Sequence, residues 1–89
     1  MEIDKVQLYI LSILTDAKAT APGVGMTLRE IAEVVNESIE HRYSFVTISR
    51  KVWALRDSGY VASKIKSNKA DMFYITEKGI EMKGVLLGE

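Results

Sequence analysis

The stretch SFVTISRKVWALRDSGYVASKIKSNKADMFYI, residues 44–75, decides the fold. Ser44 is a natural helix N-cap, and Gly59 is a natural stop after Asp57 and Ser58, so the first half predicts a helix over residues 44–58. Four of its apolar residues fall within a narrow arc of a helical wheel, and we expect them on the buried side: Phe45, Ile48, Val52 and Leu55.

The second half of the stretch has the pattern of a β-hairpin. Residues 61–66 alternate between apolar and polar, residues 67–70 are typical of a turn, and residues 71–75 form a returning strand. The apolar positions expected to face inward are Val61, Ile65, Phe73 and Ile75.

Capping boxes predict two helices before this stretch. Asp4 with Gln7 begins a helix that ends near Asp16, and Thr27 with Glu30 begins another that ends near Glu40. The connection between them contains the only proline and two glycines, and it is longer than a compact helix connection needs.

A short last helix follows the hairpin and begins at Thr76 and Glu77. The complete order is helix, helix, helix, hairpin, helix. We therefore predict one α+β, mostly α-helical domain over residues 1–89, with a three-helix bundle, a β-hairpin and a short C-terminal helix.

Composition argues against several classes of function. The 89 residues include no cysteine and one histidine, which excludes disulfides, thiol nucleophiles and zinc sites of the Cys/His type. Glu33 and Glu37 lie one helical turn apart, but nothing near them suggests a pocket or a raised pKa. We expect no enzyme activity, no cofactor and no metal. The apolar runs are too short to cross a membrane and no export signal is visible, so we expect a cytoplasmic protein.

Charge is distributed unevenly along a chain whose net charge is zero. Residues 42–69 hold seven basic residues and one acidic residue, a net charge of +6, and the remaining sequence has a net charge of −6. One part of the molecule is thus suited to a polyanion such as DNA.

Three segments resemble bacterial and archaeal winged helix-turn-helix transcriptional regulators of the MarR and PadR types. They are LREIAEVV (residues 28–35), TISRKVWALRDSGYV (residues 47–61) and FYITEKG (residues 73–79). The resemblance implies transcription-factor activity on double-stranded DNA. It places the helix of residues 44–58 in the major groove, and the hairpin of residues 61–75, the wing, along the backbone or minor groove. The connection over residues 36–43 is longer, and the last helix shorter, than in those regulators.

The outward side of the third helix supplies the first candidates for DNA contact. Small and hydroxylic side chains let a helix sit deep in the major groove, and Arg50 can reach a guanine edge, clamp a phosphate or remain a solvated charge. Arg42 can contact a phosphate or pair with Glu37 or Glu40. The candidates are Arg42, Ser44, Val46, Thr47, Ser49, Arg50 and Lys51.

The hairpin supplies four more candidates for DNA contact: Lys64, Lys66, Asn68 and Lys69. Lysines at such a tip can also serve only to keep an exposed edge soluble. Trp53 projects outward on the wheel, where it can pack under the wing, contact another protein or lie against the DNA backbone. Arg56 is expected to pack or form a salt bridge.

A homodimer that acts as a repressor is the simplest reading of the whole sequence. The candidate interface residues are Leu8, Leu11, Val85, Leu86 and Leu87, unless the first and last helices pack on each other within one chain. The alternatives are a protein that maintains plasmid or phage DNA and a winged helix used as a protein-interaction module. The sequence does not decide whether a small-molecule effector exists.

Overall fold

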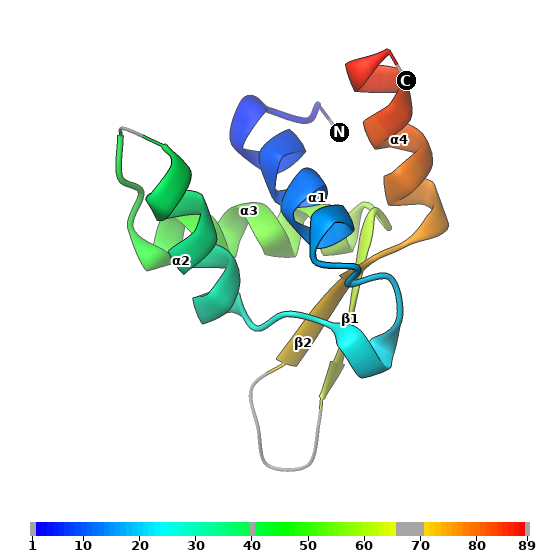
Figure 1. Ribbon diagram of the computed structural model, residues 1–89, viewed down its shortest axis with the longest axis horizontal. Coiled ribbons are helices and arrows are strands. Elements are labelled where there is room, and N and C mark those ends of the chain that lie inside the picture. The colour runs from blue at the N-terminus through cyan, green and yellow to red at the C-terminus, as the bar shows by residue number, and fades with distance from the viewer. Residues whose placement is uncertain (1, 40, 66–70, 89) are drawn as a thin grey trace.

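The computed structural model describes residues 2–39, 41–65 and 71–88. The order of elements is the predicted one, with a short 3-10 turn (η1) added after the first helix. Figure 1 shows three helices stacked above a two-stranded hairpin, with the last helix beside the first. The elements are α1 (Lys5–Asp16), η1 (Pro22–Val24), α2 (Leu28–Ser38), α3 (Phe45–Asp57), β1 (Val61–Ile65), β2 (Asp71–Ile75) and α4 (Glu77–Leu87).

Both predicted capping boxes are confirmed. The Asp4 carboxylate accepts a hydrogen bond from the Gln7 backbone N–H at 2.7 Å, and the Gln7 side chain returns one at 3.0 Å. Thr27 and Glu30 make the same pair of bonds at 3.1 Å each. Two orphan N–H groups are satisfied at each helix start, so α1 and α2 begin where local chemistry places them.

The connection between α2 and α3 is held by one side chain. Asn36 donates to the Tyr43 carbonyl oxygen at 3.0 Å and accepts from the Tyr43 backbone N–H at 2.9 Å. This amide therefore closes the connection across seven residues and supports the start of α3.

The core lies where α1, α2 and α3 meet the inner face of the hairpin. Its fully buried large side chains come from all of these elements and include Ile10, Leu14, Ile31, Val35, Ile48, Leu55, Phe73 and Ile75. Leu11 is also completely buried within the single chain, so its prediction as an outward interface residue was wrong. The side of α1 that holds Leu11 is covered by the chain's own elements, which was the alternative reading of that residue.

Phe45 corrects the predicted buried arc of α3. Ile48, Val52 and Leu55 are fully buried, but Phe45 keeps 50% of its surface exposed. It stands in the first turn of the helix, one turn before Ile48, and lines an open groove beside α2 instead of the core.

The long α1–α2 connection has a structural role that the sequence did not reveal. Met26 forms a β-bridge with Phe73, with backbone hydrogen bonds of 2.8 and 2.7 Å, and the Ala19 carbonyl oxygen accepts from the Ile75 N–H at 2.8 Å. β2 pairs with β1 along its other edge, with Val61 opposite Ile75 and Ile65 opposite Asp71. The connection therefore covers an edge of the hairpin that would otherwise be unpaired.

The last helix, α4, has 11 residues and begins at the Thr76 cap, whose hydroxyl accepts from the Gly79 N–H at 3.1 Å. Several of its apolar side chains are exposed: Ile80, Val85, Leu86 and Leu87. Of the helices in the described part of the chain, none is long and apolar enough to cross a membrane.

Candidate nucleic-acid interface

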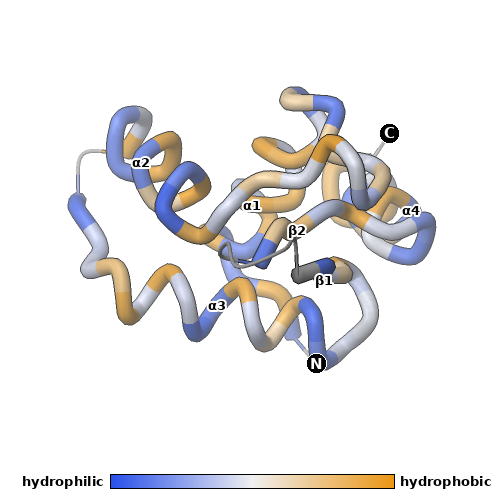
Figure 2. Tube along the Cα trace, turned by 90° about the horizontal axis from the view of Figure 1, so that it is seen from below, coloured by the Kyte–Doolittle hydropathy of each residue, from blue (hydrophilic) through white to orange (hydrophobic). Residues whose placement is uncertain are grey.

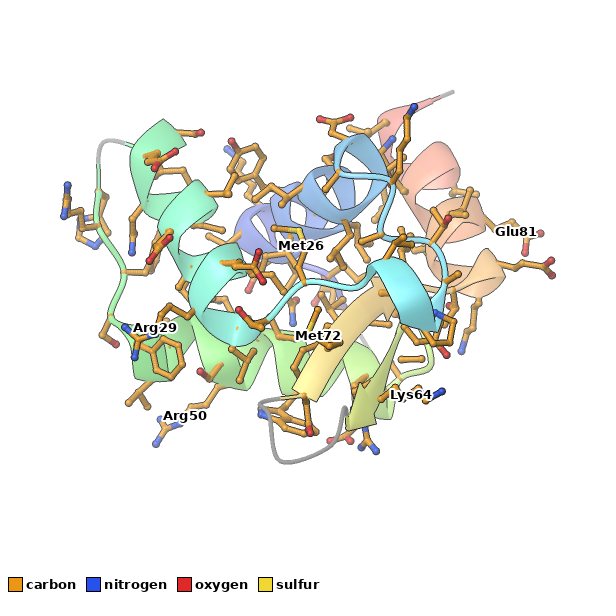
Figure 3. All side chains as sticks on the ribbon, turned by 60° about the horizontal axis from the view of Figure 1, so that its bottom comes forward. Met26, Arg29, Arg50, Lys64, Met72 and Glu81 are labelled. Carbon is orange, nitrogen blue, oxygen red and sulfur yellow. The ribbon has the colours of Figure 1, made fainter. Side chains whose placement is uncertain are left out.

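Four exposed cations lie on α2, the α2–α3 connection, α3 and β1. Figure 3 shows Arg29 on α2 and Arg50 on α3 near the start of α3, and Lys64 apart from them on β1. Arg42 lines the groove that Arg29 also lines, between α2 and the start of α3. We call the surface formed by Arg29, Arg42, Arg50 and Lys64 the basic face.

The cations of the basic face have no partners within the part of the chain that the structure describes. None of the four forms an ion pair or a hydrogen bond with any residue that the structure describes, and all four are exposed. Their charges are therefore available to an external anion. Arg29, Arg50 and Lys64 are held by α2, α3 and β1, and Arg42 by the α2–α3 connection.

The start of α3 lies near three of these cations, Arg29, Arg42 and Arg50. The Ser44 hydroxyl accepts from the Thr47 N–H at 3.1 Å, which caps the helix and sets its direction. The next two residues, Phe45 and Val46, are 50% and 57% exposed. Arg50 follows Val46 one turn later on the same face. This end of α3 is thus an accessible surface of apolar groups and one guanidinium.

An open groove of about 340 Å³ separates α2 from the start of α3. Its walls carry Arg29, Arg42 and Phe45, together with the carboxylates of Glu33 and Glu37. The groove mixes both signs of charge and is wide open to solvent, so it has neither the enclosure nor the convergent groups of a catalytic pocket.

The other end of α3 is fastened to the hairpin through Trp53. Its ring packs edge-to-face on Phe73, with centroids 5.3 Å apart, and the Arg56 guanidinium lies 5.1 Å from the Trp53 ring centroid. Arg56 also donates to the Ser63 hydroxyl on β1 at 2.8 Å. Trp53 therefore packs under the hairpin, and the predicted packing role of Arg56 is confirmed.

Comparison with solved structures places this arrangement among known folds. TubR from Bacillus megaterium pBM400 matches with a TM-score of 0.79 and 18% identity, covering 99% of this chain and 90% of TubR. MepR, a transcription regulator of the Staphylococcus aureus multidrug efflux pump MepA, matches with a TM-score of 0.77 and 17% identity, covering 98% of this chain and 57% of MepR. The fold is a winged helix-turn-helix.

A third similar winged helix was solved in complex with DNA. ZitR from Lactococcus lactis, in complex with DNA, matches with a TM-score of 0.69 and 16% identity, covering 93% of this chain and 49% of ZitR. The chain spans nearly the whole of TubR but only about half of MepR and ZitR. No protein-family model and no curated protein matches the sequence.

In this winged helix, two of the candidate DNA contacts lie elsewhere. The Lys51 ammonium is bound to the Asp4 carboxylate at the start of α1, so its assignment as a phosphate contact is corrected. The Ser49 hydroxyl oxygen is buried, with no hydrogen-bond partner among the described residues, so it is not available to DNA. Both side chains lie on the flanks of α3, and the neighbouring elements cover those flanks.

The remaining candidates divide into three groups. Arg42, Val46, Arg50 and Lys64 are exposed, and three of them belong to the basic face. Ser44 and Thr47 are joined by a 2.9 Å hydrogen bond between their hydroxyl oxygens and serve the helix cap. Lys66, Asn68 and Lys69 lie outside the described residues.

Sequence reasoning missed Arg29. It occupies the first turn of α2, where the helix dipole disfavours a positive charge. The Thr27 cap places Arg29 in this turn, so the sequence alone could have identified it as a cation at a helix start.

The Asp4–Lys51 ion pair ties α1 to α3. Burial acts to raise the pKa of Asp4, but the hydrogen bonds from Lys51 and from the Gln7 backbone outweigh burial and lower the pKa below its ordinary value. The carboxylate therefore stabilises the fold above its ordinary pKa, and this contribution is lost as pH falls through the lowered value.

Histidine and carboxylates form no metal site in the part of the chain that is described, since no group of three or more could hold an ion. His41 packs edge-on against Tyr43, with ring centroids 5.2 Å apart.

Proposed function

We propose that this protein is a sequence-specific, double-stranded DNA-binding regulator of transcription without enzyme activity. The observation that carries the proposal is the basic face, whose four cations have no partner among the described residues; three of them, Arg29, Arg42 and Arg50, lie around the exposed start of α3. The winged helix directs α3 toward the major groove, which is about 12 Å wide and admits a helix. ZitR, one of the similar winged helices, was solved in complex with DNA.

Arg50 is the proposed base contact, and Arg29, Arg42 and Lys64 are the proposed phosphate contacts. Arg50 extends from the middle of the exposed face of α3, where a guanidinium can bind guanine O6 and N7 together. The other three cations lie on α2, on the α2–α3 connection and on the wing, so they would touch the backbone on either side of the groove.

Binding to a random-sequence duplex at several salt concentrations tests the proposal. Each neutralised phosphate adds about −0.9 to the slope of log affinity against log salt, so the three proposed phosphate contacts per chain predict a slope of about −3 for each chain bound. Undetectable binding at low salt, or binding indifferent to salt, would contradict DNA as the partner.

Arg50→Ala is expected to weaken binding to a selected site by about 1–3 kcal/mol, because one bidentate contact to a base is lost. Binding to random sequence should change much less. Lys83→Ala is the matched control, because it removes one cation from α4, on the opposite side of the molecule from the wing (Figure 1). Equal losses of affinity on the selected and random duplexes would make Arg50 a phosphate contact.

We propose further that the protein acts as a homodimer and as a repressor. Leu8 on α1 is half-buried, and Val85, Leu86 and Leu87 on α4 are exposed, so an apolar surface remains on the adjacent first and last helices. A two-fold dimer would require two half-sites about one helical turn apart. Sequences selected from a random library should then be palindromic, with half-sites at this spacing.

A role in plasmid or phage DNA maintenance would use the same contacts. A protein-interaction module is less well supported, because Trp53, its natural anchor, is packed against Phe73 and Arg56.

A further inference from the structure

The first turn of α3 exposes two large apolar side chains in succession. Phe45 is 50% and Val46 is 57% exposed, whereas every apolar residue further along α3 is buried or half-buried. Figure 2 views the molecule from below and shows α3 crossing it, with this hydrophobic first turn at the end next to α2. Exposure of such groups has a free-energy cost, which a partner that covers them would offset.

The surroundings of these two residues indicate the chemistry of that partner. Phe45 lines grooves together with Arg29 and Arg42, and Val46 lies one helical turn from Arg50 on the same face. An apolar protein surface seated here would bury three guanidinium groups that have no partner among the described residues, which is costly. A polyanion that also presents apolar groups fits this pattern.

Acidic residues near this turn limit how the partner approaches. Glu33 and Glu37 line the same groove as Phe45, but they follow Arg29 by about 6 and 12 Å along α2 at 1.5 Å per residue. Asp71 lies in the second groove beside Phe45. The electrostatically favourable approach is therefore from the side of Arg29 and Arg50.

The thymine C5 methyl is the apolar group that base pairs offer in the major groove of DNA. We propose that Phe45 and Val46 recognise thymine methyl groups and so give this protein a preference for thymine next to the base that Arg50 contacts. This inference rests on the proposed DNA binding. Burial of one methyl-sized group is worth a factor of about four in affinity, from about 0.8 kcal/mol per group.

Deoxyuridine tests the inference, because it differs from thymidine only by lacking this methyl. In a duplex selected for tight binding, each thymine is replaced singly by deoxyuracil and the affinity is measured. We expect about fourfold weaker binding at one or two positions per half-site, and no change at the others.

Variants connect that effect to the two side chains. With Phe45→Ala or Val46→Ala, the ratio of thymine to deoxyuracil affinity at a sensitive position should fall to about one. Val24→Ala, which shortens an apolar residue of similar exposure (54%) in η1, should keep the ratio. Circular dichroism checks that the three variants are folded, as expected for changes at exposed positions.

The outcomes separate this inference from the proposed function. Tight, salt-dependent binding that is indifferent to deoxyuracil at every position would overturn thymine recognition and leave DNA binding intact. A thymine preference that survives both alanine variants would assign the recognition to other residues. Failure to bind any duplex would remove both proposals.

Discussion

Gly79→Ala is expected to lower the free energy of unfolding by about 3 kcal/mol or more. A Cβ at this position would lie 2.1 Å from the Tyr60 carbonyl oxygen and 2.7 Å from Ile75 Cγ1. The Tyr60 oxygen is part of the backbone and already accepts the Thr76 N–H at 3.1 Å, so it has little freedom to move. Overpacking of this kind costs about 1–3 kcal/mol even where side chains can adjust.

Chemical denaturation of the Gly79→Ala protein, followed by circular dichroism, measures this loss. Gly23→Ala is the matched control, because a Cβ there would meet nothing within 4 Å. We expect the control to unfold at nearly the wild-type denaturant concentration. Equal stability of the two variants would show that the contact between α4 and Tyr60 is looser than described.

Phe73→Ala is expected to cost about 3–5 kcal/mol of stability, the usual range for a buried phenylalanine. Phe73 is completely buried, packs against Trp53, and belongs to the strand that bridges to Met26. Its removal would leave a cavity beneath the wing, and in a domain this small the folded state would be marginal.

Phe45→Ala provides the comparison for Phe73→Ala, because it makes the same chemical change at a half-exposed position. Thermal unfolding should show a large drop in midpoint for Phe73→Ala and a small one for Phe45→Ala. Similar drops for both would mean that Phe45 contributes to the core as the helical wheel first predicted.

Elements that depend on local chemistry were predictable from the sequence. The capping boxes at Asp4 and Thr27, the stop at Gly59 and the hairpin alternation each involve residues only a few positions apart. Local hydrogen bonds and side-chain periodicity fix such features, so a single sequence contains the information.

Contacts between distant segments were not predictable in the same way. Lys51 pairs with Asp4 across 47 residues, and Met26 bridges to Phe73 across a similar span. A helical wheel shows which way a side chain leaves its own helix, but not which neighbour covers it. For that reason Leu11 was wrongly predicted to be exposed and Phe45 to be buried. The predicted DNA contacts of Lys51 and Ser49 have the same origin.

The placement of Arg29 was predictable from the sequence only in part. Its position in the first turn of α2 follows from the Thr27 cap, and the unfavourable helix dipole marks it as unusual. Its closeness to Arg42 depends on the connection that Asn36 closes, which only the structure reveals.

The bridge between Met26 and Phe73 bears on how the molecule would meet a duplex. Met26 stands three residues before Arg29, and Phe73 lies in the strand paired with Lys64, so two backbone hydrogen bonds join both cations to one rigid junction. In the proposed complex with DNA, the backbones of Arg29 and Lys64 would therefore keep a constant separation while their side chains reach for phosphates. Duplexes whose groove width already fits this separation would bind without being deformed. Stiffer or wider sequences would bind more weakly, even where they differ only at positions that no side chain touches.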